Sequence, residues 1–133
     1  MKWSKWYYFN KETLKQIPTA PGIYRIRCFS NRKPLKIQRP VKIDINGLTY
    51  IGKGSDLHSR LSTFWRNCNN SKSYGHIAGV NYALYRYSRL FPINRLQYQF
   101  KRIEQGKTKA VEKQLLNEYL SEFLDLPPLN FSV

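Results

Sequence analysis

Hydrophobic and polar positions alternate along three stretches of the chain. Residues 22–29 and 96–103 show this pattern, and residues 41–45 and 48–51 show it on either side of Asn46-Gly47. A period of two places successive side chains on opposite faces of a strand, so each run predicts a strand with one buried face. Because Asn-Gly favours a type I′ turn, we expect the two runs that flank it to pair as a hairpin.

Elsewhere, apolar residues recur at helical spacing and predict four helices. Thr108 is the expected N-cap of the last helix, and Pro92 ends the third. In the third helix, Val80 and Leu84 define the expected apolar side. The four helices are expected over Lys11–Gln16, Leu57–Asn67, Ile77–Leu90 and Thr108–Leu124.

The order of these elements predicts an α+β fold. We expect a small, mostly antiparallel sheet flanked by helices, with a three-stranded core and an extra hairpin strand. The length of 133 residues predicts a single domain over residues 1–133. Within it, residues 1–16 form an aromatic N-terminal extension, and residues 30–47 form an inserted loop and hairpin arm. The extension serves either as a hydrophobic lid on the sheet or as a stacking platform for bases.

Composition adds a strong positive charge to this picture. The chain carries 23 Lys and Arg against 8 Asp and Glu, for a net charge of +15, and 15% of its residues are aromatic. Such a balance favours a polyanionic partner, most often nucleic acid, over a merely soluble basic protein. Cys28 and Cys68 lack metal-binding spacing, and no apolar run is long enough to span a membrane. We therefore expect a cytoplasmic protein with free thiols and no membrane partner.

Two tyrosines are the first candidates for chemistry. Tyr24 and Tyr50 lie in neighbouring predicted strands, where both side chains can project from one face. Gly22 and Gly52 lie close to them in the sequence. Two phenols and two glycines in one place suit a closely approaching anion such as phosphate.

Two charged residues extend this candidate site. Arg60 lies one turn into the second helix, where a guanidinium either binds phosphate through paired donors or remains a surface charge. Glu112 precedes Leu116 and Leu120 at steps of four residues, so it is expected to point toward the body of the domain. An inward carboxylate needs a partner, which is either a metal ion or a basic side chain.

Taken together, these residues resemble a GIY-YIG nuclease domain over residues 17–131. The resemblance rests on five motif elements in the family's order. They are Gly22-Ile23-Tyr24, Tyr50-Ile51-Gly52, Arg60, Glu112 and Pro128-Leu129-Asn130. Lys53 after the second tripeptide is similar to the version found in nucleotide-excision-repair nucleases.

The resemblance implies a metal-dependent phosphodiesterase with a three-stranded antiparallel core. Its site roles would be distributed over six residues. Tyr24 would contact or activate the attacking water, Tyr50 would orient the phosphate, Arg60 would offset phosphoryl charge, Glu112 would hold one Mg²⁺ or Mn²⁺, Lys53 would assist near the phosphate, and Asn130 would brace the site.

The chain departs from the family in two places. The spacer between the tripeptides, residues 25–49, is longer than is usual, which we attribute to the inserted hairpin arm. Phe64 stands one turn after Arg60, where family members often have Tyr or His. This shifts the general-base role to Tyr24, whose pKa we expect a nearby cation to lower. His76 is a weak substitute and is expected at the surface.

From these features we expect a metal-dependent endonuclease that acts on DNA, although RNA also fits. Lys53, Arg60, Arg25 and Arg27 are the expected nucleic-acid-binding residues, and no small-molecule cofactor is expected. The oligomeric state is open between monomer and homodimer. The alternative is a non-catalytic nucleic-acid-binding protein that keeps the nuclease fold.

Overall fold

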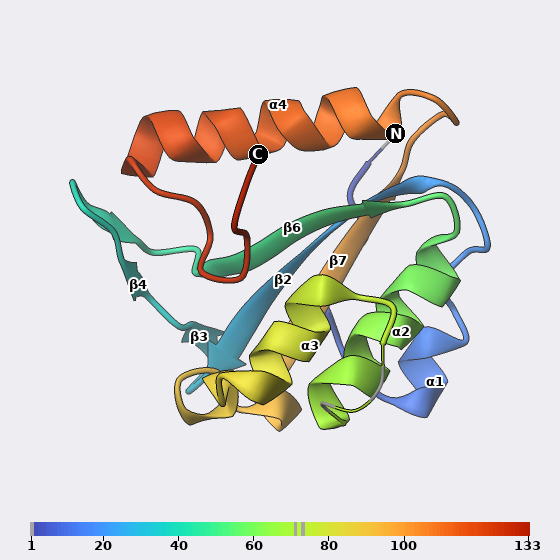
Figure 1. Ribbon diagram of the computed structural model, residues 1–133, viewed down its shortest axis with the longest axis horizontal. Coiled ribbons are helices and arrows are strands. Elements are labelled where there is room, and N and C mark those ends of the chain that lie inside the picture. Colours follow the sequence, from blue (N-terminus) through green and yellow to red (C-terminus); the bar gives the residue numbers. More distant parts are fainter. Residues whose placement is uncertain (1, 71, 73) are drawn as a thin grey trace.

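The computed structural model describes residues 2–70, 72 and 74–133. Within these residues, five strands form one antiparallel sheet (Figure 1). The strands are β1 (Tyr7–Tyr8), β2 (Gly22–Ser30), β3 (Lys33–Pro34), β6 (Leu48–Gly54) and β7 (Leu96–Arg102). Strand β2 is central, with β7 on one side and β6 on the other, and β3 pairs only with its end. The expected α+β class and three-stranded antiparallel core are confirmed.

Helices cover both faces of the sheet. The short α1 (Lys11–Leu14), α2 (Leu57–Asn69) and α3 (Ile77–Leu84) lie on one face, and α4 (Thr108–Phe123) crosses the other (Figure 1). Asn10 and Asp56 accept hydrogen bonds from the first turns of α1 and α2. Two short 3₁₀ turns, Tyr87–Arg89 and Ile93–Arg95, lead from α3 into β7.

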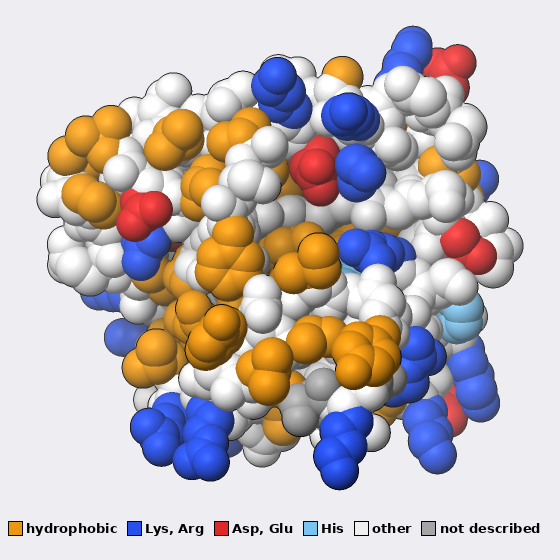
Figure 2. Space-filling model, viewed as in Figure 1, with side chains coloured by type: hydrophobic (Ala, Val, Ile, Leu, Met, Phe, Trp, Pro, Cys, Tyr) orange, Lys and Arg blue, Asp and Glu red, His pale blue; other side chains and the backbone are white. Residues whose placement is uncertain are grey.

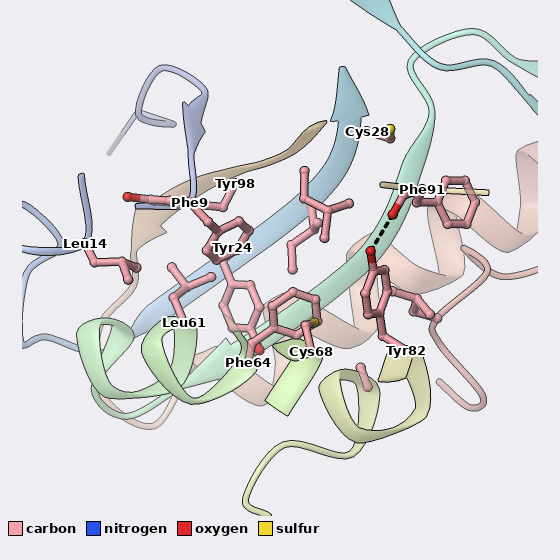
Figure 3. Packing of buried hydrophobic residues seen from close by; sticks show 14 of the residues in the cluster. Phe9, Leu14, Tyr24, Cys28, Leu61, Phe64, Cys68, Tyr82, Phe91 and Tyr98 are labelled. Atoms are coloured by element: carbon pink, nitrogen blue, oxygen red, sulfur yellow. Dashed lines mark hydrogen bonds between the residues drawn. The ribbon is translucent and has the colours of Figure 1, made fainter. Parts of the chain in front are cut away.

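The main core lies between the sheet and α2. Alternation along β2 sends Tyr24 and Ile26 to this side, where they meet Leu61 and Phe64 of the helix (Figure 3). All four side chains are buried. Burial of each such side chain stabilises the fold by about 1.5–3 kcal/mol. The alternating and helical spacing of apolar residues in the sequence reflects this burial. The core also encloses Cys28 and Cys68, which are free thiols as expected.

The N-terminal segment covers part of the opposite face of the sheet. The Arg25 guanidinium lies 4.0 Å from the Trp3 ring centroid, and that of Arg27 lies 4.1 Å from the Trp6 ring centroid. Their Nε atoms donate to the side-chain oxygens of Gln99 and Gln97 on β7. Because guanidinium groups already lie over the indole rings, this segment fits the lid interpretation better than the stacking platform.

The predicted hairpin around Asn46-Gly47 is wrong. The run before this turn forms only β5 (Ile43–Asp44), which pairs with β4 (Ile37–Gln38) in a separate small sheet, while β6 pairs with β2. The reason is the buried Asp44 carboxylate, which accepts hydrogen bonds from the backbone N–H groups of residues 46, 47 and 48. Because the Asp44 side chain accepts hydrogen bonds from these N–H groups, they form an Asx-type turn and do not pair across a hairpin.

Two further expectations need correction. Residues 30–40, expected as a surface loop, contain β3 and β4, and a tight turn at Asn31-Arg32 with positive φ at both residues joins β2 to β3. Helix α3 ends at Leu84, which is 57% exposed, and buries Ala78, Gly79 and Tyr82 instead of its expected apolar side. The Tyr82 hydroxyl donates to the backbone oxygen of Phe91, which fixes that orientation (Figure 3).

No helix in the described ranges combines the length and apolar character needed to cross a bilayer.

We predict that Asp44→Ala lowers the free energy of unfolding by about 3 kcal/mol. Asp44 is 1% exposed and accepts a fourth hydrogen bond from the Tyr119 hydroxyl, so its loss leaves several donors unpaired. Urea denaturation measures the change. Glu12→Ala, at an exposed side chain of α1, is the control and should change stability by under about 0.5 kcal/mol. A similar small effect of Asp44→Ala would contradict this account.

Candidate active site

Tyr24 and Tyr50 meet on the face of the sheet that α1, α2 and α3 cover (the helix-covered face). The register pairs Tyr24 with Gly52 and Ile26 with Tyr50, and the two phenol rings lie 6.0 Å apart between centroids. A Cβ at Gly52 would lie 2.6 Å from the Tyr24 hydroxyl oxygen and 2.6 Å from the Tyr50 ring. Gly52 is therefore required for the packing of the two phenols. This differs from the expectation that the glycine makes room for an anion.

His76 completes this group of rings and was missed as a site residue. The side chain, expected at the surface, is only 1% exposed. Its Nε2 atom lies 2.5 Å from the Tyr24 hydroxyl oxygen, and its ring meets those of Tyr50 and Phe64 edge to face. His76 stands at the N-cap of α3, whereas Phe64 fills the position on α2 where the resemblance leads one to expect Tyr or His. An imidazole is thus present, from a different helix.

The contact with Gly79 favours one tautomer of the His76 ring. Its Nδ1 accepts a long, 3.4 Å hydrogen bond from the backbone N–H of Gly79, as an N-cap side chain does. Burial, assisted by the charge of Arg60, lowers the pKa of His76 to about 3. At neutral pH the ring therefore carries one proton, which belongs on Nε2, and Nε2–H donates to the Tyr24 oxygen.

The expectation that Tyr24 titrates below its free value is not supported. Burial raises the pKa of Tyr24 well above its usual value, and the neighbouring Tyr50 adds to the rise. The Arg60 charge acts in the opposite direction without cancelling the effect of burial. Tyr24 is 0% exposed, so desolvation of a phenolate dominates. In the free protein Tyr24 is a neutral phenol at physiological pH.

Arg60 is tied into the same site. Its Nη1 donates to the backbone oxygen of Gly75 at 2.6 Å, which holds the residue just before His76. Its charge also lowers the pKa of Tyr50, although burial of that phenol raises the pKa by more. These contacts favour the interpretation of Arg60 as a site residue over its interpretation as a surface charge. One N–H group of the guanidinium donates to the Gly75 oxygen and another to the Tyr24 hydroxyl, and the others remain for a ligand.

Glu112 lies on α4, within electrostatic reach of these residues. Burial raises the pKa of its half-buried carboxyl, while the charges of Lys53 and Arg60 lower it. Glu112 and Tyr50 line the same cavity, and the Glu112 charge raises the pKa of both phenols. The predicted inward orientation is thus supported. Across the described part of the chain, no group of three or more His, Cys, Asp or Glu is arranged to hold a metal ion.

Asn130 binds the free edge of β6. Its Oδ1 accepts from the backbone N–H of Ile51 at 3.0 Å, and its Nδ2 donates to the backbone oxygen of the same residue at 2.9 Å. The backbone N–H of Leu129 donates to the oxygen of Thr49 at 2.9 Å. The C-terminal segment therefore satisfies an edge that would otherwise be unpaired. Asn130 thus holds strand β6 next to Tyr50, and its part in a reaction stays a prediction.

The structure does not bring every expected residue to this site. Arg25 and Arg27 project from the opposite face of β2 and stack on Trp3 and Trp6. Strand alternation explains the separation, because Arg25 directly follows Tyr24. The other expected site residues lie together around β6. They are Tyr24, Tyr50, Lys53, Arg60, Glu112 and Asn130.

Comparisons of the chain with protein-family models, with curated proteins and with solved structures yield no match.

We predict that His76→Asn flattens the dependence of stability on acid pH. The unfolded chain protonates this imidazole below about pH 6.5, whereas the folded chain does so only near 3, so the free energy of unfolding falls as the pH drops through that window. Each pH unit removes at most about 1.4 kcal/mol. Asn retains an oxygen that can cap α3 but cannot titrate. Urea denaturation from neutral pH to about pH 4 tests this; parallel profiles for both proteins would refute it.

Proposed function

We propose that the protein is a divalent-metal-dependent endonuclease that hydrolyses phosphodiester bonds, with DNA as the first substrate to test. The observation that carries this proposal is that Tyr24, Tyr50, Arg60 and Glu112, from four different elements, lie around strand β6 of a strongly basic protein. These residue types also carry the resemblance to GIY-YIG nucleases. A structural role alone does not explain why a guanidinium, a carboxylate and two phenols are gathered there.

Arg60 and Lys53 are the residues that would bind the phosphate. The guanidinium already donates to the Gly75 oxygen, which fixes its orientation before a ligand arrives. Its remaining N–H groups can donate to two phosphoryl oxygens, and such preorganised donors stabilise the charge that develops during hydrolysis. Lys53 adds a charge on the same side as Glu112. Tyr50, partly exposed, would orient the phosphate from the helix-covered face.

Glu112 fits a metal site that is completed by its substrate. Mg²⁺ in phosphoryl-transfer sites is often held by one or two carboxylates, several waters and the substrate phosphates. Burial raises the pKa of Glu112, and a bound cation would favour its charged form. When bound, Mg²⁺ or Mn²⁺ supplies positive charge to the phosphoryl oxygens and activates a water. With a single carboxylate available, we expect weak metal binding in the absence of nucleic acid.

The buried hydrogen bond to His76 decides what Tyr24 can do. Nε2–H of His76 donates to the Tyr24 oxygen, and the phenol's own proton is donated to the neighbouring Tyr50 hydroxyl. Because Tyr24 is wholly buried, at neutral pH it would hold that proton and act on the attacking water or a phosphoryl oxygen through Tyr50. It becomes a general base only if positive charge brought by the substrate complex lowers its pKa.

Two observations favour the alternative function. The Tyr24 hydroxyl is wholly buried, and Phe64 cannot transfer protons. A protein that binds nucleic acid without cutting it would also be consistent with these features. The two functions differ in metal dependence, because phosphate-driven binding requires basic residues but no metal ion.

We predict that the wild-type protein nicks supercoiled plasmid in Mg²⁺ or Mn²⁺ and that EDTA abolishes nicking. Glu112→Gln should lower the rate by at least about a hundredfold while leaving DNA affinity within a few-fold, because it removes the ligand charge but not the basic residues. Glu118→Gln, an exposed glutamate on the same helix, is the matched control. Wild-type binding without nicking in any divalent cation would favour the non-catalytic alternative.

We also predict that Arg60→Lys is not a conservative change. An ammonium group cannot hold the Gly75 oxygen and present paired donors to phosphate in the same fixed geometry. Turnover should fall by roughly a hundredfold or more, as it does when a transition-state donor is lost. Arg89→Lys, at an exposed arginine in a 3₁₀ turn, should keep the wild-type rate. A near wild-type rate for Arg60→Lys would show that Arg60 acts only as a surface charge.

A further inference from the structure

A cavity lies directly beside the candidate active site. It has a volume of about 300 Å³ and is bounded by β6, the start of α3, α4 and the C-terminal segment. Tyr50 and Glu112 form its border with the site. Pockets of this size are at the lower end of those that hold small organic ligands, so this one fits a single planar ring system.

Most residues that line the cavity are apolar or aromatic, and Glu112, Asn130 and Ser132 add polar surface. Leu116 and Ala78 form a buried part, while Ile77 is 75% exposed and Phe131 is 59% exposed at its rim. Large hydrophobic side chains with such exposure need an explanation when they gather at one place. Figure 2 shows hydrophobic side chains collected on this face, next to a hollow where basic and acidic side chains meet.

We propose that this cavity receives an unstacked nucleobase next to the phosphate on which the site acts. An extruded base is typically held by stacking on aromatic and apolar side chains, and Tyr50 and Phe131 supply two rings here. The cations Lys53 and Arg60 near the border of the cavity provide the charge that a nucleotide's phosphate requires. The net charge of +15 and the aromatic content of the chain favour a nucleic-acid strand as the partner.

The proposal has a consequence for substrate choice and rests on the proposed function. A base in a perfect duplex must be unpaired and unstacked before it can enter, which costs a few kcal/mol, whereas a single-stranded or bulged base incurs less of this cost. The protein should therefore prefer single-stranded or locally unpaired nucleic acid. The preferred substrate class is thus set by a pocket that shares Tyr50 and Glu112 with the reacting groups.

The experiment measures binding without cleavage. Glu112→Gln protein is titrated into fluorescently labelled oligonucleotides of the same sequence as a single strand, a perfect duplex and a duplex with a single-nucleotide bulge. We expect the single strand and the bulged duplex to bind roughly tenfold more tightly than the perfect duplex. Adding Phe131→Ala should remove most of that preference, a loss in the range known for one stacked base.

Matched variants distinguish stacking from charge. Phe131→Ala should leave the slope of affinity against salt unchanged, because no charge is lost, whereas Lys53→Ala should reduce it. Ile77→Ser provides a second test of the pocket. Tyr85→Ala removes a 68% exposed aromatic outside the cavity and should leave the preference intact.

Three results would overturn the proposal. The first is equal affinity for all three oligonucleotides, and the second is a Phe131→Ala effect of the same size on each of them. The third is a change in the monomer–dimer equilibrium of the Phe131→Ala protein without any change in its single-strand affinity, which would assign the surface to a second copy of the chain. Each leaves the nuclease test intact, because plasmid nicking by the wild-type protein is measured separately. Conversely, base-dependent binding with no metal-dependent nicking would contradict the nuclease proposal alone.

Discussion

The candidate site depends on one buried hydrogen bond, between the Tyr24 hydroxyl oxygen and Nε2 of His76. It joins the central strand of the sheet to the beginning of α3, two elements far apart in the sequence. Two other features keep it in place: Gly52 leaves room for the Tyr24 ring, and Arg60 holds the oxygen of the residue before His76. A polar pair without solvent is tolerated only when its donors and acceptors are matched, and here the neutral imidazole supplies that match.

Around this pair, residues from both faces and from the free edge of β6 form one site on the surface. Tyr50 projects to the helix-covered face, Glu112 approaches from α4 beyond the other face, and Asn130 occupies the edge. An edge strand is normally protected against pairing with other chains, and the C-terminal segment gives that protection while lining the adjoining cavity. The same segment therefore serves stability and shapes the space in which a nucleotide would bind.

The sequence predicted much of the architecture, and its failures have physical causes. Strands β2 and β7 and helices α2 and α4 were expected almost to the residue, because alternating or helical apolar patterns reflect burial. The Asn46-Gly47 hairpin failed because a single carboxylate, Asp44, accepts hydrogen bonds from the turn's backbone N–H groups, and the Asn-Gly signal outweighed this local Asx turn in the prediction. His76 was placed at the surface because its partner lies 52 residues away. The available signal for a role of His76 was that Phe64 stands where the resemblance leads one to expect Tyr or His, in a chain with two histidines.

The most direct test of this account is the protonation state of His76, read by nitrogen NMR of the imidazole in the free protein. The account predicts a neutral ring with its proton on Nε2 from about pH 8 down to about pH 4, and protonation only near pH 3. Tyr24→Phe should shift the Nε2 resonance, because that substitution removes the acceptor. A His76 ring that titrates near pH 6.5, or that carries its proton on Nδ1, would contradict the buried pair and the site built on it.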